Sequence, residues 1–139
     1  MASNKNNLED FERFMEQRQK ASSAFLDGDV GPLVQMSVTR SPATLFPPSG
    51  FCIEGATAVN DANENGAASF VSGIKNTFEV MHQDADESLA YWTGLQRSTV
   101  KMAGQQEAVV FNLRVTEIFR KENESWKLMH RHADKLVTD

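Results

Sequence analysis

The sequence contains one cysteine and no long apolar run. A single thiol, Cys52, excludes an internal disulfide and a metal site built from several cysteines. Spanning a bilayer takes a run of about 20 apolar residues, and none is present. The first residues, MASNKNNLEDF, also lack the apolar segment of a signal peptide. We therefore expect a cytoplasmic protein that does not bind membranes.

Positive charge is also scarce. The chain has 14 basic and 19 acidic residues, which gives a formal net charge of -5. Because nucleic-acid binding depends on clustered lysine and arginine, a chain with no basic stripe is not expected to bind DNA or RNA. The sequence contains no GxGxxG, Walker or G-x-S-x-G motif. We expect neither a cofactor nor a metal ion.

The length of 139 residues and the apolar content of 40% suit one domain with a buried core. We predict that this domain spans residues 1–139, with loose tails at 1–6 and 137–139. No internal repeat or linker divides the chain.

Helical periodicity dominates the first half. A helix is predicted over 8–26, with Asn7 as its N-cap and an apolar stripe of Phe11, Phe14, Met15, Ala21, Ala24 and Phe25. Asp29 can cap a short second helix over 30–36. A third helical pattern begins after Gly55 and runs through Ala56, Val59, Ala62, Ala67, Phe70, Val71 and Ile74.

The second half alternates with a period of two. We predict strands over 76–82 and 89–101, and then a long hairpin over 107–134. Shorter extended segments are predicted over 38–46 and 51–54, on either side of a Pro-Pro turn. Three helices followed by antiparallel strands indicate an α+β fold with the helices on one face of the sheet.

Several segments resemble one family, namely ATLFPPSG at 43–50, LAYWTG at 89–94, VTEIFRKE at 115–122 and WKLMHRHAD at 126–134. They are similar to the NTF2-like or SnoaL-like superfamily, with a cystatin-like α+β cone, and most to its calcium/calmodulin-dependent kinase II association-domain branch. The resemblance implies three helices packed on a strongly curved, mixed and mainly antiparallel sheet. It also implies a pocket at the wide end of the cone and a homodimer formed through the outer sheet face.

Glu117 interrupts an apolar strand face. Alternate residues from 109 to 119 are otherwise apolar: Val109, Phe111, Leu113, Val115 and Phe119. Burial there would raise the pKa of Glu117 and suit it to general acid or base catalysis. The alternative is a carboxylate that reaches solvent or pairs with an arginine such as Arg131.

Tyr91 is a second candidate, since the ketosteroid-isomerase-like members of the resembled superfamily use a phenol to polarise a carbonyl. The alternative is an aromatic residue that packs in the core. Thr93 and Glu117 stand where the resembled association domains carry pocket arginines. This departure argues against a simple anion-binding pocket like theirs.

His130, His132 and Asp134 follow at intervals of two, so they share one face of a strand. They suit a proton relay, a metal site, or hydrogen-bonded histidines at the hairpin or dimer face, and we favour the last. A three-residue loop, 122–124, would place His130 opposite Thr116 on the outer face. A shift of one residue would turn it inward.

We therefore predict a pocket that binds a small apolar or semi-polar molecule. The expected catalytic residues are Glu117, Tyr91 and His130, and the expected ligand-binding residues are Thr93, Leu95, Phe111, Leu113, Val115, Arg131, His132 and Asp134. Whether the chain is an enzyme stays open; a cofactor-independent isomerase, cyclase, dehydratase or hydrolase would use proton-transfer chemistry. The alternative is a non-catalytic oligomerisation or association module.

Overall fold

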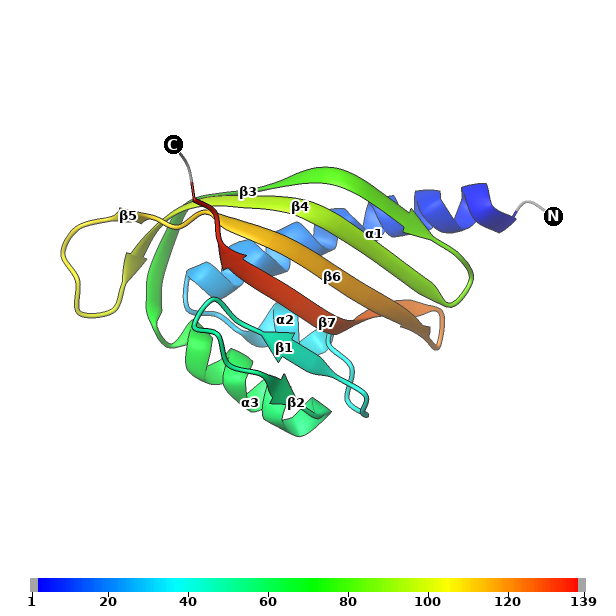
Figure 1. The fold of residues 1–139 in the computed structure, drawn as a ribbon, viewed down its shortest axis with the longest axis horizontal. Coiled ribbons are helices and arrows are strands. Elements are labelled where there is room, and N and C mark those ends of the chain that lie inside the picture. Colours follow the sequence, from blue (N-terminus) through cyan, green and yellow to red (C-terminus); the bar gives the residue numbers. More distant parts are fainter. Residues whose placement is uncertain (1–2, 138–139) are drawn as a thin grey trace.

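The computed structural model describes residues 3–137, which form three helices and a seven-stranded sheet (Figure 1). The elements in chain order are α1 (Ser3–Leu26), α2 (Gly31–Gln35), β1 (Thr44–Phe46), β2 (Ile53–Glu54), α3 (Ala56–Ala67), β3 (Phe70–Ala85), β4 (Leu89–Met102), β5 (Val109–Val110), β6 (Leu113–Glu122) and β7 (Ser125–Lys135). The sheet order is β2-β1-β7-β6-β4-β3, and β5 pairs with β4. The β1–β7 pair is parallel and the other pairs are antiparallel. The predicted α+β class is confirmed.

Helix α1 lies across one face of the sheet, which we call the inner face (Figure 1). Its buried residues recur every three or four positions: Phe11, Met15, Arg18, Ser22 and Leu26. They face a core that contains Phe78, Trp92, Phe119 and Trp126. The helix begins at Ser3, so Asn7 lies within it and the predicted N-cap is wrong. Within residues 3–137, no helix combines the length and apolar character needed to cross a bilayer.

The predicted third helix is too long. Helix α3 ends at Ala67, and Phe70, Val71 and Ile74 belong to β3. Register shifts near Phe70 and Gly73 break the two-residue alternation there, so the apolar residues imitate a helical spacing. The predicted strand over 38–46 is likewise reduced to β1, which begins two residues after Pro42.

Gly94 on β4 allows the sheet to bend. A Cβ at this position would collide with the backbone oxygen of Glu79 and approach the backbone nitrogen of Met81. The β3 strand carries a bulge between Val80 and His82, next to this contact. A side chain at Gly94 would therefore hold the backbone of β3 away from β4.

The β6–β7 hairpin decides which residues face the core. Its turn has two residues, Asn123 and Glu124, both with positive φ, and not the three-residue loop that we considered from the sequence. An irregularity between Ile118 and Phe119 then shifts the register by one residue. As a result Ile118 pairs with His130 and Thr116 with His132. The two histidines lie on the face opposite α1, which we call the outer face.

Candidate functional site

Glu117 on β6 is fully buried and ion-paired. It has 0% exposure and accepts four hydrogen bonds. Its Oε1 accepts from Arg18 Nε at 2.9 Å and from Trp92 Nε1 at 2.8 Å. Its Oε2 accepts from Arg18 Nη2 at 2.6 Å and from Arg131 Nη1 at 2.8 Å. We call Glu117, Arg18, Arg131 and Trp92 the buried cluster.

Strand pairing and one helix bring the buried cluster together. Trp92 on β4 and Arg131 on β7 are the register partners of Glu117, one on each side. Residues directly opposite each other in a sheet share a face, so all three side chains point inward. Arg18 reaches them from the buried stripe of α1.

The charges of the two arginines determine the ionisation of Glu117. Burial alone would raise the pKa of its carboxyl group, but Arg18 and Arg131 outweigh that effect and lower the pKa to about 2. Glu117 is therefore ionised at neutral pH. The alternative interpretation, that Glu117 pairs with an arginine such as Arg131, is confirmed. The raised pKa is wrong, because the charges of Arg18 and Arg131 outweigh burial.

A hydrogen-bond network continues from the buried cluster. Arg131 Nη2 donates to Gln96 Oε1 at 2.8 Å. Gln96 Nε2 donates to Asn76 Oδ1 at 3.1 Å and to Ser22 Oγ at 3.3 Å. Ser98 Oγ also donates to Asn76 Oδ1, at 2.7 Å. Polar side chains from α1, β3, β4 and β7 are thus held in fixed positions.

A cavity of about 70 Å³ lies beside the buried cluster. A buried water needs about 10–15 Å³ on this measure, so the space exceeds that of a single water. One end is polar, with Arg18, Ser22, Gln96 and Arg131. The rest is mainly apolar and is formed by Phe25, Leu26, Leu33, Leu45, Val59, Phe111, Leu128 and Met129, with Ser37, Thr44, Asn63 and His130 also in its wall.

The comparisons with known proteins agree with this fold. The family model of the SnoaL-like domain matches residues 19–135. The chain belongs to the SnoaL-like family. A search of curated proteins found no match.

Solved structures similar to this SnoaL-like chain share its fold at low sequence identity. A candidate dehydratase of the NTF2-like family from Streptomyces avermitilis is 16% identical over 93% of this chain and 98% of its own, with a TM-score of 0.71. An NTF2-like superfamily protein from Salmonella enterica is 13% identical over 91% of each chain, with a TM-score of 0.72. The CaMKII hub homology domain of Chlamydomonas reinhardtii is 16% identical over 91% of this chain and 97% of its own, with a TM-score of 0.66. The predicted superfamily and its association-domain likeness are confirmed.

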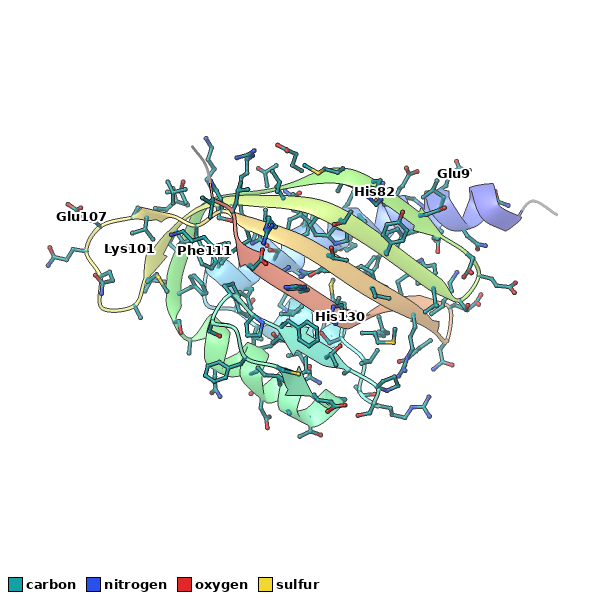
Figure 2. All side chains as sticks on the ribbon, in the orientation of Figure 1. Glu9, His82, Lys101, Glu107, Phe111 and His130 are labelled. Carbon is teal, nitrogen blue, oxygen red and sulfur yellow. The ribbon has the colours of Figure 1, made fainter. Side chains whose placement is uncertain are left out.

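The structure of this SnoaL-like chain does not bring together the three residues predicted to be catalytic. Glu117 faces inward, whereas Tyr91 pairs with Ile118 on the outer face. The Tyr91 hydroxyl lies 2.9 Å from Nδ1 of His82. In Figure 2, His82 lies on β3 and His130 on β7, well apart on the sheet. Trp92, and not Tyr91, is the β4 side chain that contacts Glu117.

His130 lies on β7 next to β1, on the outer face by its register, and it also contributes to the wall of the cavity. Its Nδ1 is 2.6 Å from Thr44 Oγ1, and the ring of Phe46 meets both His130 and His132 edge-on. Burial and the neighbouring His132 lower the pKa of His130, which favours its neutral form. Among residues 3–137, no group of three or more His, Cys, Asp or Glu side chains is arranged to hold a metal ion.

The predicted ligand-binding residues fall into three places. Phe111 and Arg131 line the cavity. Leu113 and Val115 are buried in the main core. The other four border a shallow hollow on the outer face: Thr93, Leu95, His132 and Asp134.

Sequence reasoning missed Arg18, Ser22 and Gln96. The signal for Arg18 and Ser22 was present, because they continue the helical spacing of Phe11 and Met15. A charged residue at such a position is rarely left without a partner. Gln96 gave no comparable signal in the sequence.

Proposed function

We propose that this SnoaL-like chain binds a small molecule in the cavity between α1, α3 and the β1–β7 part of the sheet. The supporting observation is the cavity itself, which combines mainly apolar walls with a few fixed polar groups at one end. Binding sites for small molecules commonly have this composition. The polar end would orient the ligand, and the apolar walls would bind its body.

Glu117 acts in this proposal as a fixed charge and not as a proton carrier. Its oxygens already accept four hydrogen bonds, and its pKa of about 2 keeps it ionised. Its function would be to hold Arg18 and Arg131 at the cavity wall. Tyr91 lies on the other sheet face, so the two side chains have no common substrate position. The geometry therefore favours binding over proton transfer.

A variant that fills the cavity tests this proposal. Val59 on α3 lines the cavity, and Ala58, its neighbour, is exposed. Small-molecule fragments are screened by ¹⁵N NMR for shifts in the amides of Leu33 and Phe111. We expect Val59→Phe to weaken binding by about tenfold or more, since overpacking excludes the ligand.

The matched control is Ala58→Phe, which adds the same ring on the solvent side of α3 and should leave binding unchanged. Fragments that bind Val59→Phe as well as the parent protein, or that shift only outer-face amides, would contradict the proposal. So would a screen in which no fragment shifts the cavity amides.

A second candidate function, association of copies through the outer sheet face, is favoured by that face's composition. Met81 is 63% exposed there and borders the same hollow as Thr93, Leu95 and Thr116. A mixture of apolar and small polar side chains is typical of a moderately polar protein interface. The hub homology domain among the similar structures suggests this function by its name. A homodimer formed through this face would be compatible with ligand binding in the cavity.

Light scattering coupled to size exclusion tests the association. We expect twice the mass of one chain for the parent protein and a single-chain mass for Met81→Glu, which would place a charge in the interface. Val110→Glu is the control. Val110 is an exposed apolar residue like Met81, but it lies on β5, away from the hollow. A dimer that survives Met81→Glu, or a parent protein that is monomeric, would contradict an interface at this face.

A further inference from the structure

Among the residues that the structure describes, one nitrogen of Arg18 has no hydrogen-bond partner. Its Nε and Nη2 both donate to Glu117, and its side chain is 2% exposed. Nη1 is also buried and has no hydrogen-bond partner among the residues that the structure describes. Arg18 itself lines the cavity. A buried charged donor left unpaired is unfavourable, so a ligand atom that accepts a hydrogen bond from this nitrogen would stabilise the site.

The charges around the cavity indicate which charge the ligand should carry. Arg18 and Arg131 are both cations, and Glu117 supplies one negative charge between them. One positive charge is therefore left over. Of the described residues that line the cavity, none is acidic. A single negative charge on the ligand would balance the site, whereas a doubly charged group would overcompensate it.

The remaining side chains that line the cavity are mainly apolar, and they indicate an apolar body for the ligand. Phe25, Leu26 and Leu33 come from the helices α1 and α2, and Val59 comes from α3. Phe111 and Leu128 close the cavity from the sheet side. These side chains bind an apolar body by removing it from water. The cavity volume, about 70 Å³, is several times the roughly 10–15 Å³ that one water needs on the same measure, so the body is that of a small molecule.

We propose that the ligand is a small monocarboxylic acid whose carboxylate accepts a hydrogen bond from Nη1 of Arg18, with its apolar body against the Phe and Leu walls. This inference rests on the proposed function, because it names the ligand class for the same cavity. A guanidinium nitrogen suits a carboxylate oxygen in geometry and charge. Glu117 holds the other two nitrogens of Arg18, so the acid would meet an arginine already fixed in position.

The test compares acids with neutral molecules of the same shape. Hexanoate and benzoate are titrated against hexanamide and benzamide, and binding is followed by ¹⁵N NMR at the amides of Leu33 and Phe111. We expect each acid to bind about tenfold or more tighter than its amide, because only the acid supplies the missing charge. This comparison uses the unmodified protein, so it needs no variant to fold.

Variants then assign the preference to Arg18. Arg18→Lys keeps a cation beside Glu117 but removes Nη1, and it should lower the acid-to-amide ratio several-fold, because the carboxylate loses its hydrogen-bond donor while the positive charge stays. Arg114→Lys is the control, since Arg114 makes the same kind of pair with Asp134 on the outer face, and it should keep the preference. If Arg18→Lys does not fold, the acid and amide titrations of the parent protein decide alone.

The outcomes separate the two proposals. Acids and amides that shift the cavity amides with equal affinity would overturn the carboxylate inference and leave the proposed function in place. An acid-to-amide ratio that is unchanged in Arg18→Lys would also overturn the inference. If none of the four compounds shifts the cavity amides, the carboxylate inference is overturned. The proposed function is tested separately, by the wider fragment screen.

Discussion

Two arginine–carboxylate pairs, one on each face of the sheet, have similar geometry and opposite surroundings. Arg18 donates to Glu117 at 2.9 and 2.6 Å on the inner face, and Arg114 donates to Asp134 at 2.7 and 2.8 Å on the outer face. Side-chain exposure is 2% and 0% for the inner pair but 63% and 38% for the outer pair. Distances alone would rank the two pairs as equal.

Burial makes them different. Water screens the outer pair and can solvate either partner alone, so losing one partner matters little. The inner pair has lost its water, and either group alone would be an uncompensated charge in the core. We therefore expect the inner pair to act as a structural unit that fixes one end of the cavity, and the outer pair to contribute little to stability.

The largest expected effect comes from breaking the inner pair. Glu117→Ala should lower the free energy of unfolding by about 3–5 kcal/mol, because it leaves Arg18 buried and without its counter-charge. Asp134→Ala, its counterpart on the outer face, should leave the urea midpoint nearly unchanged. Equilibrium urea unfolding of both variants gives the comparison. Equal losses would show that burial does not distinguish the two pairs.

Acid should reveal the same difference. The pKa of Glu117 falls from 4.5 to about 2 in the folded protein. The folded state therefore favours the ionised form, so its stabilising effect is complete above pH 4.5 and is lost as the pH falls from 4.5 to about 2. Urea midpoints of the parent protein and Glu117→Gln should converge over that range. A constant difference between the two proteins would contradict the low pKa.

The two tryptophans offer a smaller test. Trp92 Nε1 donates to Glu117, whereas Trp126 Nε1 is buried with no partner among the described residues. Replacement by Phe removes the indole N–H in both cases. A hydrogen bond to a charged group contributes about 1.5–3 kcal/mol, so Trp92→Phe should lose about that much more stability than Trp126→Phe. Equal losses would indicate that packing alone accounts for Trp92.

The smallest expected effect is that of Tyr91→Phe. Among the described residues, the Tyr91 hydroxyl forms a hydrogen bond only with His82, which lies on the outer face. Binding of any cavity ligand and the urea midpoint should both stay within experimental error of the parent values. A loss of cavity binding would show that Tyr91 acts on the inner site, against the register of β4 and β6.

Periodicity in the sequence predicted the helix α1, the strand β4 and the alternation along β6, because each depends on one element alone. The two faces of β6 were also assigned correctly, with Leu113, Val115, Glu117 and Phe119 together on one face. What the sequence alone could not supply was how separate elements meet. The bulge beside Ile118 and the short turn at 123–124 together determine where His130 points.

Arg131 was named from the sequence as a possible partner of Glu117, but its second partner, Arg18, was hidden for the same reason. Arg18 is 99 residues away in the chain, and no local pattern connects the two positions. Without Arg18, a buried carboxylate is expected to have a raised pKa; with it, the pKa falls. Contacts with arginines thus decided between the two interpretations of Glu117 that the sequence left open.

The most direct measurement is the ¹³C chemical shift of the Glu117 carboxyl carbon as the pH is lowered from about 8 to about 3. Our account predicts a constant shift over that range, because two buried arginines keep the group ionised. The Glu117→Gln variant assigns the resonance by its absence. A titration with a midpoint at or above the ordinary value of 4.5 would contradict the account. It would restore Glu117 as a candidate proton carrier.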